Sequence, residues 1–289
     1  MWSWIDTLVQ GLLLGGLYGL FALGQALIFG VMRLTNTAHG DFIVLGAFMA
    51  FLVTTGLGIN PFVAGALLLP LAFGFGYALQ RFPLNGTLGK DPLPSLVVTF
   101  GLAIVIQNAL QQGFTADPRS IDSMGLNIQG VALTEQLSIG VLPLLIFVLA
   151  LACTAGLQWM SQRTALGRAF RAVSDDREVA QLMGLRASHV YAMATGIAFV
   201  LIALAGTLQG MRTTVSPSDG PALLLFAFEA VIIGGMGSFW GTFAGALILG
   251  VTQSIGFRFN PGWGIWFGHL VFLAVLVWRP QGLFPKTKG

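Results

Sequence analysis

The stretch LVQGLLLGGLYGLFALGQALIFGV, residues 8–31, carries no charged side chain and only two amides, Gln10 and Gln25. A helix that crosses a bilayer needs about 20 consecutive, mainly apolar residues. This stretch meets that requirement and therefore predicts a membrane-spanning helix. Its N-terminal flank carries Asp6 rather than the basic residues of a signal peptide, so we expect the helix to remain in the mature chain.

The whole chain has the same apolar character. Hydrophobic residues make up 55% of it and charged residues only 9%, whereas a soluble domain carries about 25% charged residues. The net charge of +3 is small and scattered, so the sequence does not predict nucleic-acid binding. The single cysteine, Cys153, lies in an apolar run and predicts a buried small hydrophobic residue rather than a disulfide.

Eight apolar runs predict membrane spans, near residues 8–31, 40–58, 61–80, 95–113, 139–160, 189–211, 240–257 and 263–279. A further stretch, 222–235, is short and ends in a glycine-rich segment, which predicts a broken or re-entrant helix. The longest loops, 114–138 and 161–188, are too short for a soluble domain. We therefore expect an all-α polytopic bundle of about eight or nine spans, forming one transmembrane domain over residues 1–289.

The basic residues predict the direction of the bundle. With loop 161–188 in the cytoplasm and spans alternating outward from it, eleven of the 14 basic residues fall inside. They are Arg33, Arg81, Lys90, Arg163, Arg168, Arg171, Arg177, Arg186, Arg279, Lys286 and Lys288. Arg119, Arg212 and Arg258 fall outside, and the positive-inside rule selects this orientation. Loop 114–138, which has acidic residues including Glu135 and no clear structure, then faces outward.

Enzyme and metal motifs are absent from the sequence. The three histidines, His39, His189 and His269, have no ligand partner at helical spacing, which argues against a metal site. The segment Gly86–Asp91 is too short for a phosphate loop, and Asp91 stands where Ser or Thr would bind magnesium. We therefore expect no catalytic residue, no metal site and no cofactor in this chain.

Loop 161–188 contains the signals of a short helix. Asp175 can cap its N-terminus, with Glu178 three residues later completing a capping box. Gly184 is a natural C-terminal stop, and Leu185 can fold back onto the last turn. These signals predict a cytoplasmic helix of about eight residues, a length that is marginal in water without a docking surface.

The apolar face of this helix leaves two interpretations open. Val179, Leu182 and Met183 share one face at helical spacing. That face either packs on the protein's own bundle or the lipid surface, or it inserts into a groove of a cytoplasmic partner.

This loop resembles the cytoplasmic coupling loop of permeases from the branched-chain amino acid family of ABC importers. The family pattern is Gly-Arg-Ala, a basic residue and Ala, an acidic or polar pair, a central Ala and a closing Met-Gly. The matching positions are Gly167-Arg168-Ala169, Arg171-Ala172, Asp175-Asp176, Ala180 and Leu182-Met183-Gly184. The loop thus resembles the family over its whole central part.

Three further segments carry the resemblance along nearly the whole chain. Asn36-Thr37-Ala38-His39-Gly40-Asp41 is similar to the family's Asn-Phe-Ala-His-Gly-Glu/Asp, with Thr37 where Phe is usual. Gly234-Gly235-Met236-Gly237-Ser238 with Gly241, and the tail Arg279-Pro280-Gln281-Gly282-Leu283-Phe284, resemble two further family segments in the expected order. Length and loop pattern resemble the shorter of the two paired permeases.

The resemblance implies a multi-pass subunit of the bacterial inner membrane. Such a permease pairs with a second homologous permease, binds two cytoplasmic ATPases and receives solute from an extracytoplasmic binding protein. ATP and magnesium are then expected in the partner ATPases and not in this chain. The implied ATPase-coupling residues are Gly167, Arg168, Arg171, Asp175, Asp176, Val179, Ala180, Leu182, Met183 and Gly184.

Polar groups at membrane depth form two clusters. Because such groups usually face a cavity or a partner, we predict that they line a translocation path. The two clusters are Asn36, Thr37, His39 and Asp41, and Glu229 with Gly234, Gly235 and Ser238. Each half of the chain thus offers an interrupted apolar segment, which is typical of internal repeats with a path at their interface.

A structural interpretation stands beside this one. Asp41 suits a helix N-terminus, and His39 can hydrogen-bond within the fold. The glycines can serve close helix packing, as small-residue ridges such as Gly11-x-x-x-Gly15 and Gly241-x-x-x-Gly245 do.

The sequence leaves competing functions to compare. A self-contained secondary transporter or channel would need ion-coupling acids in its spans, and only Glu229 lies deep in an apolar run. A membrane enzyme would need clustered catalytic residues at one face, and the sequence shows none. An ABC importer permease is the leading hypothesis. The resemblance implies that its solute is a branched-chain amino acid or a related small molecule, with amides, urea and aromatic acids left open.

Overall fold

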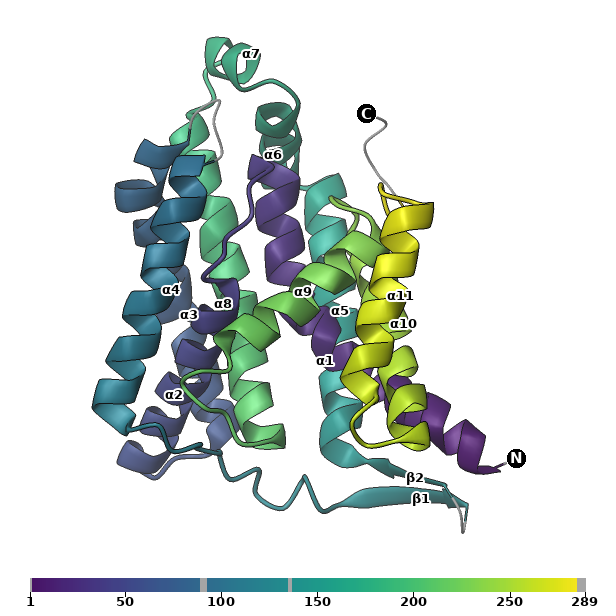
Figure 1. Ribbon diagram of the computed structural model, residues 1–289. Coiled ribbons are helices and arrows are strands. Elements are labelled where there is room, and N and C mark those ends of the chain that lie inside the picture. The colour runs from purple at the N-terminus through teal and green to yellow at the C-terminus, as the bar shows by residue number, and fades with distance from the viewer. Residues whose placement is uncertain (1, 89–92, 135–136, 285–289) are drawn as a thin grey trace.

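The apolar runs fold into helices that lie side by side in a computed structural model, which describes residues 2–88, 93–134 and 137–284 (Figure 1). The first part contains α1 (Trp2–Met32), α2 (His39–Leu57), α3 (Pro61–Leu79), the short turns η1 (Gln80–Leu84) and η2 (Asn85–Thr87), α4 (Leu93–Phe114), strands β1 (Gly130–Thr134) and β2 (Leu137–Gly140), and α5 (Val141–Arg163). The second part contains α6 (Ala165–Asp175), α7 (Arg177–Leu182), α8 (Ala187–Arg212), α9 (Gly220–Gly234), α10 (Phe239–Phe259) and α11 (Gly264–Trp278). The predicted all-α bundle is confirmed.

Seven of the described helices are long and apolar enough to cross a membrane by length and composition. The apolar helices α9 and α11 are shorter, at 15 residues each. Each of the eight predicted spans, and the short stretch 222–235, coincides with a helix. Lys90, Lys286, Lys288 and Glu135, together with residues 89–91 of the rejected phosphate loop, lie outside the described residues.

The elements separate to the two ends of the bundle. Helices α6 and α7 and the end of α11 lie at one end, while the start of α1 and the β1–β2 hairpin lie at the other (Figure 1). This separation is the one that alternating spans require. We call the end with α6 and α7 the cytoplasmic end, following the positive-inside rule, and the opposite end the outer end.

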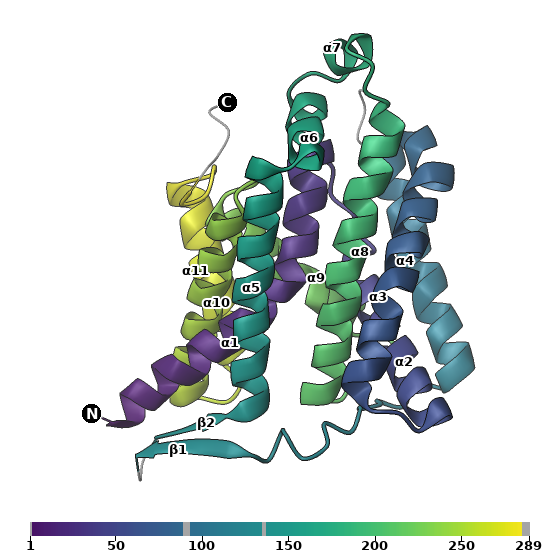
Figure 2. The same ribbon diagram turned by 180° about the vertical axis from the view of Figure 1, so that it is seen from behind.

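The helices form two halves of opposite direction, α1–α4 and α8–α11. Helix α1 runs from the outer to the cytoplasmic end, and α8 runs the opposite way (Figure 1). Helix α1 packs against α10, and its counterpart α8 packs against α3, the counterpart of α10. Helix α5 connects the halves and runs beside α1, as Figure 2 shows from behind. The two halves therefore run in opposite directions and make matching helix contacts, as the halves of an inverted repeat do.

Glycines allow the closest of these helix contacts. A Cβ atom on Gly15 would lie 2.6 Å from the Leu247 Cα, and one on Gly250 would lie 2.4 Å from the Gly11 carbonyl oxygen. Small residues let helix backbones approach where lipid provides no hydrophobic driving force. The predicted Gly11–Gly15 ridge is therefore the contact between α1 and α10.

The outer loop contains structure that the sequence did not predict. Strands β1 and β2 pair antiparallel, with Val131 opposite Ile139. Arg119 pairs with Val215 of the α8–α9 connection through N–H···O bonds of 2.9 and 2.7 Å. The strands are only 5 and 4 residues long, too short for a clear alternating pattern, and tertiary pairing decides their conformation.

Candidate functional site

Helices α2 and α9 meet at their N-termini inside the bundle. Both begin about half-way along it rather than at an end, α2 running outward and α9 toward the cytoplasmic end (Figure 1). A Cβ atom on Gly40 would lie 1.9 Å from the Gly220 carbonyl oxygen, and one on Gly220 would lie 1.9 Å from Asp41 Oδ1. Only glycine fits at either position. The two half-helices therefore bring two positive helix ends together around one carboxylate.

The segment before α2 is held by its own side chains. Asn36 is buried, and its Oδ1 accepts the Ala38 N–H at 3.0 Å. His39 is fully buried, with Nε2 2.7 Å from the Phe21 carbonyl oxygen, which identifies Nε2 as the protonated nitrogen. Both side chains bond within the fold, as the structural interpretation of this cluster proposed.

Thr37 and Asp41 instead contact helix α4. The Thr37 hydroxyl lies 2.8 Å from the Thr99 hydroxyl, and Gln107 Nε2 donates to Asp41 Oδ1 at 2.8 Å. Asp41 is only 2% exposed and stands in the first turn of α2. Sequence reasoning missed Thr99 and Gln107, although polar residues inside the apolar run 95–113 were a visible signal.

The second half breaks at the predicted glycine-rich segment, since α9 ends at Gly234 and α10 begins at Phe239, and it also breaks earlier. The earlier break, in the connection 213–219 before α9 begins at Gly220, was not predicted. There the Asp219 carboxylate accepts the Ser216 N–H at 2.8 Å. The signal was Ser216-Pro217-Ser218-Asp219-Gly220-Pro221, a run of turn-forming residues that end one helix and start another.

Gly234, Gly235 and Ser238 form the turn between α9 and α10. A Cβ atom on Gly234 would lie 2.1 Å from the Gly241 carbonyl oxygen, and Gly235 has a φ of +100°. Ser238 caps α10, because its Oγ accepts the Gly241 N–H at 3.1 Å. Their roles in the fold are therefore close packing, chain reversal and capping.

The C-terminal tail closes the end of α9. The N–H groups of Leu283 and Phe284 donate to the carbonyl oxygens of Ile233 and Gly234 at 2.9 and 3.0 Å. Those carbonyls are among the last of the helix and have no partner within it. Gly282 makes the approach possible, since it has a φ of +80° and a Cβ there would lie 2.4 Å from the Gly235 Cα.

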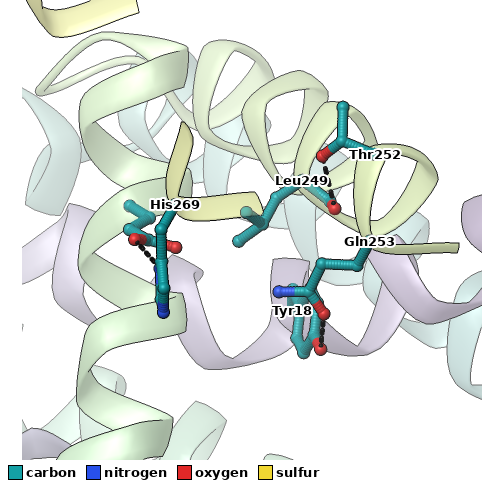
Figure 3. Close-up of polar contacts among 6 residues, drawn as sticks. Tyr18, Leu249, Thr252, Gln253 and His269 are labelled. Atoms are coloured by element: carbon teal, nitrogen blue, oxygen red, sulfur yellow. Dashed lines mark hydrogen bonds and ion pairs between the residues drawn. The ribbon is translucent and has the colours of Figure 1, made fainter. Parts of the chain in front are cut away.

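Glu229 of α9 forms an ion pair with His269 of α11. Its Oε1 lies 2.5 Å from His269 Nδ1, while Oε2 has no hydrogen-bond partner. The Glu229 side chain is 1% exposed and that of His269 is 31% exposed. Figure 3 shows His269 beside the buried pair Tyr18 and Gln253, whose Oη and Oε1 are 2.6 Å apart. The sequence suggested Glu229 but not His269, because 40 residues separate them.

The cytoplasmic loop folds as two helices, α6 and α7. Thr164 caps α6, and Asp176 caps α7 by accepting the N–H groups of Glu178 and Val179 at 2.9 and 3.0 Å. The prediction of Asp175 as the cap was therefore wrong. Helix α6 begins at Ala165 and extends to Asp175. The break between α6 and α7 therefore lies one residue later than predicted.

The end of α7 follows the predicted pattern. Gly184 is left-handed, with a φ of +86°. The Leu185 N–H donates to the Ala180 carbonyl at 3.0 Å, and the Gly184 N–H donates to that of Gln181 at 3.0 Å. This pair of bonds is a Schellman motif, which ends the helix and turns the chain toward α8.

The apolar face of α7 points away from the bundle. Val179, Leu182 and Met183 are 54%, 86% and 80% exposed, whereas Ala180 is buried. These three side chains therefore do not pack on the protein's own helices, which leaves the lipid surface and a groove of a cytoplasmic partner as the two interpretations. Figure 1 shows α7 as the outermost element at the cytoplasmic end.

Helix α6 joins this exposed element to the bundle. A Cβ atom on Gly167 would lie 2.3 Å from the Ser161 carbonyl oxygen, which also accepts a hydrogen bond from Arg171. Ser174 donates to the Gly30 carbonyl at 2.9 Å. Arg171 and Asp175 line a cavity of about 190 Å³ with residues of α1 and of the α9–α10 turn. Arg168 is exposed, and among the described residues its side chain donates to the Arg163 carbonyl oxygen at 3.5 Å.

Comparison with known proteins assigns the chain to a family. Residues 7–278 match the family described as the permease component of the branched-chain amino acid transport system. The chain belongs to this family. Because these proteins are transport components, the permease is not itself expected to catalyse a reaction. Among the described residues no group of three His, Cys, Asp or Glu side chains could hold a metal ion.

Individual relatives agree with this assignment. The permease is 29% identical to the high-affinity branched-chain amino acid transport system permease protein BraD of Pseudomonas aeruginosa, over 100% of this chain and 98% of that protein. It is 25% identical to the corresponding protein LivH of Escherichia coli K12, over 87% and 85% of the two chains. The fold is similar to PsaBC from Streptococcus pneumoniae, with a TM-score of 0.51, 12% identity and coverage of 95% and 94%.

Proposed function

We propose that this permease is the membrane-spanning subunit of an ATP-binding-cassette importer that moves branched-chain amino acids or a closely related small solute. The observation that carries the proposal is the family match over residues 7–278, joined to a bundle with an inverted repeat and an exposed cytoplasmic helix. The full-length similarity to BraD supports the solute class, since that protein is the permease of a high-affinity branched-chain amino acid transport system. The inner membrane of a bacterium is the expected location.

The translocation path runs along the face that carries α2, α4, α9 and α11. This face contains the junction of the two half-helices, with Thr37 and Asp41 bonded to α4. It also contains Glu229 and His269, the only described ion pair. Polar groups at membrane depth are placed where they meet water, solute or protein. A second permease of similar fold would cover the face and enclose the path.

Helix α7 docks into a cytoplasmic ATPase. A helix this short is marginally stable in water by itself. A groove in a partner would stabilise it by burying its three exposed apolar side chains. Gly167, Arg171 and Ser174 fix α6 to the ends of α5 and α1, so a movement of α7 reaches the bundle. Two ATPases bind ATP and magnesium, and an extracytoplasmic binding protein delivers the solute.

Replacing Leu182 and Met183 with Asp tests the docking helix. We expect the variant to insert in the membrane and to lose co-purification with the ATPase, because two charges would enter an apolar groove. Gln181→Glu is the matched control, since it adds one charge to the same helix at an exposed position outside the apolar face. Co-purification of the double variant at the level of the control would contradict the docking assignment.

Reconstitution into vesicles tests the importer itself. The permease pair with its ATPases, binding protein and ATP should accumulate leucine, and this chain alone should move none. Leucine transport by the chain alone, without ATP, would instead support a self-contained transporter.

A further inference from the structure

One ionisable pair of the bundle is open to its surroundings on one side only. Glu229 is 1% exposed, whereas the His269 side chain is 31% exposed. The Nδ1 of His269 is occupied by Glu229 Oε1 at 2.5 Å, which leaves Nε2 as the free polar atom of the ring. No described residue hydrogen-bonds to Nε2.

The chemistry of this ring differs from that of its neighbours on α11. Ile265, Leu270 and Leu273 are exposed and apolar, as suits a surface toward lipid or a partner helix. An ionisable ring directed into hydrocarbon would lose hydration without compensation, so intramembrane His and Glu face a water-filled cavity or a partner group. Glu229 is the buried partner of His269, and by the proposed function the exposed part of the ring meets the water-filled path.

The buried carboxylate determines what His269 presents. A negative charge on Glu229 with no counter-charge would be strongly disfavoured at 1% exposure, so the pair stays neutral as a whole. Because Oε2 is buried with no partner to accept a proton from it, a neutral pair has one proton between Nδ1 and Oε1 and the other on Nε2. His269 then offers an N–H donor to the path, whichever partner holds the shared proton.

Apolar side chains border this donor. The ring of Phe226 lies 6.5 Å from that of His269, with 17° between their planes, and Tyr18 stacks on Phe226 at 4.9 Å. Leu225, on the exposed side of α9, is 40% exposed. The surface thus combines a donor supported by a carboxylate with aromatic and aliphatic groups. That combination is complementary to a solute with a carboxylate next to an aliphatic side chain.

We propose that His269, held by Glu229, binds the carboxylate of the solute as it moves along the path. This inference rests on the proposed function and adds a residue that favours a solute with a charged carboxylate over a neutral amide or urea, because the hydrogen bond to the charged oxygen is stronger. Phe226 and Leu225 contact the aliphatic side chain of the same solute.

Thiol labelling of the assembled transporter tests whether His269 faces water. The variants His269→Cys and Leu270→Cys are made in a Cys153→Ala background and assembled in vesicles. During ATP turnover each is treated with a charged, membrane-impermeant thiol reagent added on both sides of the membrane. We expect His269→Cys to react and to be protected by saturating leucine with binding protein. Leu270→Cys, the adjacent matched control, should react at least about tenfold more slowly, because thiolates form poorly in lipid. Equal rates for the two cysteines would overturn the proposal.

Transport measurements test the carboxylate contact. His269→Leu should lower leucine uptake per assembled complex about tenfold, the effect of one lost charge-assisted hydrogen bond, while His269→Gln retains most of it. His269→Leu leaves the Glu229 carboxylate without its partner. The double variant His269→Leu, Glu229→Gln removes that buried charge as well, and its leucine uptake should equal that of His269→Leu alone. If His269→Leu, alone or combined with Glu229→Gln, took up leucine at the wild-type rate, the inference would be overturned. A wild-type assembly that shows no ATP-dependent uptake would instead contradict the proposed function.

Discussion

Helices α2 and α9 occupy equivalent places in the two halves, but they use their polar groups differently. In α2 the polar residues lie at the break itself, where Asn36 and His39 bond to the backbone and Asp41 stands beside the crossing. In α9 the first turn is Gly220-Pro221, and the charged residue, Glu229, lies more than two turns later. In α2 the charged residue that contacts a second helix, Asp41, lies at the break itself, whereas in α9 the charged residue, Glu229, pairs with His269 well away from the break.

The difference indicates a division of roles. Asp41 has its hydrogen bond from Gln107 inside the bundle, next to two helix N-termini that favour a negative charge. One oxygen of Glu229 has no hydrogen-bond partner, and the other pairs with His269, whose side chain is 31% exposed. The α2 junction therefore stabilises the crossing, whereas we propose that the α9–α11 pair binds the solute. An inverted repeat preserves the backbone path of its halves without preserving the chemistry placed on them.

The crossing of the half-helices is the feature that both halves share, and breaking it should have the largest effect. Gly220→Ala places a Cβ against Asp41, and Gly40→Ala places one 1.9 Å from the Gly220 carbonyl oxygen. We expect each to cost about 3 kcal/mol or more, because neither backbone can move aside in a packed core. Thermal unfolding in detergent, followed by size exclusion, measures the loss.

Gly74→Ala and Gly101→Ala are matched controls for the crossing. Both glycines lie in long helices with nothing within 4 Å of a new Cβ atom. They should leave stability unchanged or slightly improved, since Ala has the higher helix propensity. If Gly220→Ala behaved like these controls, the close crossing would be wrong.

Asp41→Ala should have the next largest effect, and it acts on the α2 side alone. It removes a carboxylate from a helix N-terminus and leaves the Gln107 amide without its acceptor, which costs about 2 kcal/mol. Asp41→Asn retains an acceptor for Gln107 and should recover part of the loss. The stability of the purified protein is the measurement, and equal losses for the two variants would show that the hydrogen bond contributes nothing.

The tail tests the far end of α9. Removing residues 280–289 deletes the two N–H donors that reach Ile233 and Gly234, at a cost of about 1–2 kcal/mol. Removing residues 285–289 alone keeps both donors and is the control. Hydrogen exchange at the C-terminal turn of α9 should increase only in the longer deletion.

Glu229→Gln should have the smallest effect on stability and so sharpens the contrast with Asp41. The amide oxygen still accepts from His269 Nδ1, and the change removes a buried charge, so stability should shift by less than about 1 kcal/mol. Leucine uptake by the assembled transporter should fall nevertheless. A destabilisation as large as that of Asp41→Ala would assign Glu229 a structural role.

Sequence reasoning reached the local features of the site more reliably than its long-range ones. The Gly184 stop and the Val179, Leu182 and Met183 face depend on neighbours within two helical turns, and the structure has both. We predicted Asp175 as the N-cap of α7, but the N-cap is Asp176, because Asp175 is the last residue of α6. The end of one helix thus determines where the next one begins. Thr99, Gln107 and His269 were missed because their partners lie 62, 66 and 40 residues away.

The sequence by itself determined the solvent and the positions of the apolar helices, and it predicts the direction of the bundle. Apolar composition, run length and the distribution of basic residues follow from the cost of placing polar groups in lipid, which acts on each segment separately. Only the tertiary structure decided that the second half also breaks before α9, that Gly40 meets Gly220, and that Glu229 meets His269. These features arise from contacts between helices that are distant in the chain. Hydrophobicity alone gives the alternative helix arrangements similar free energies, and packing and hydrogen bonds select one of them.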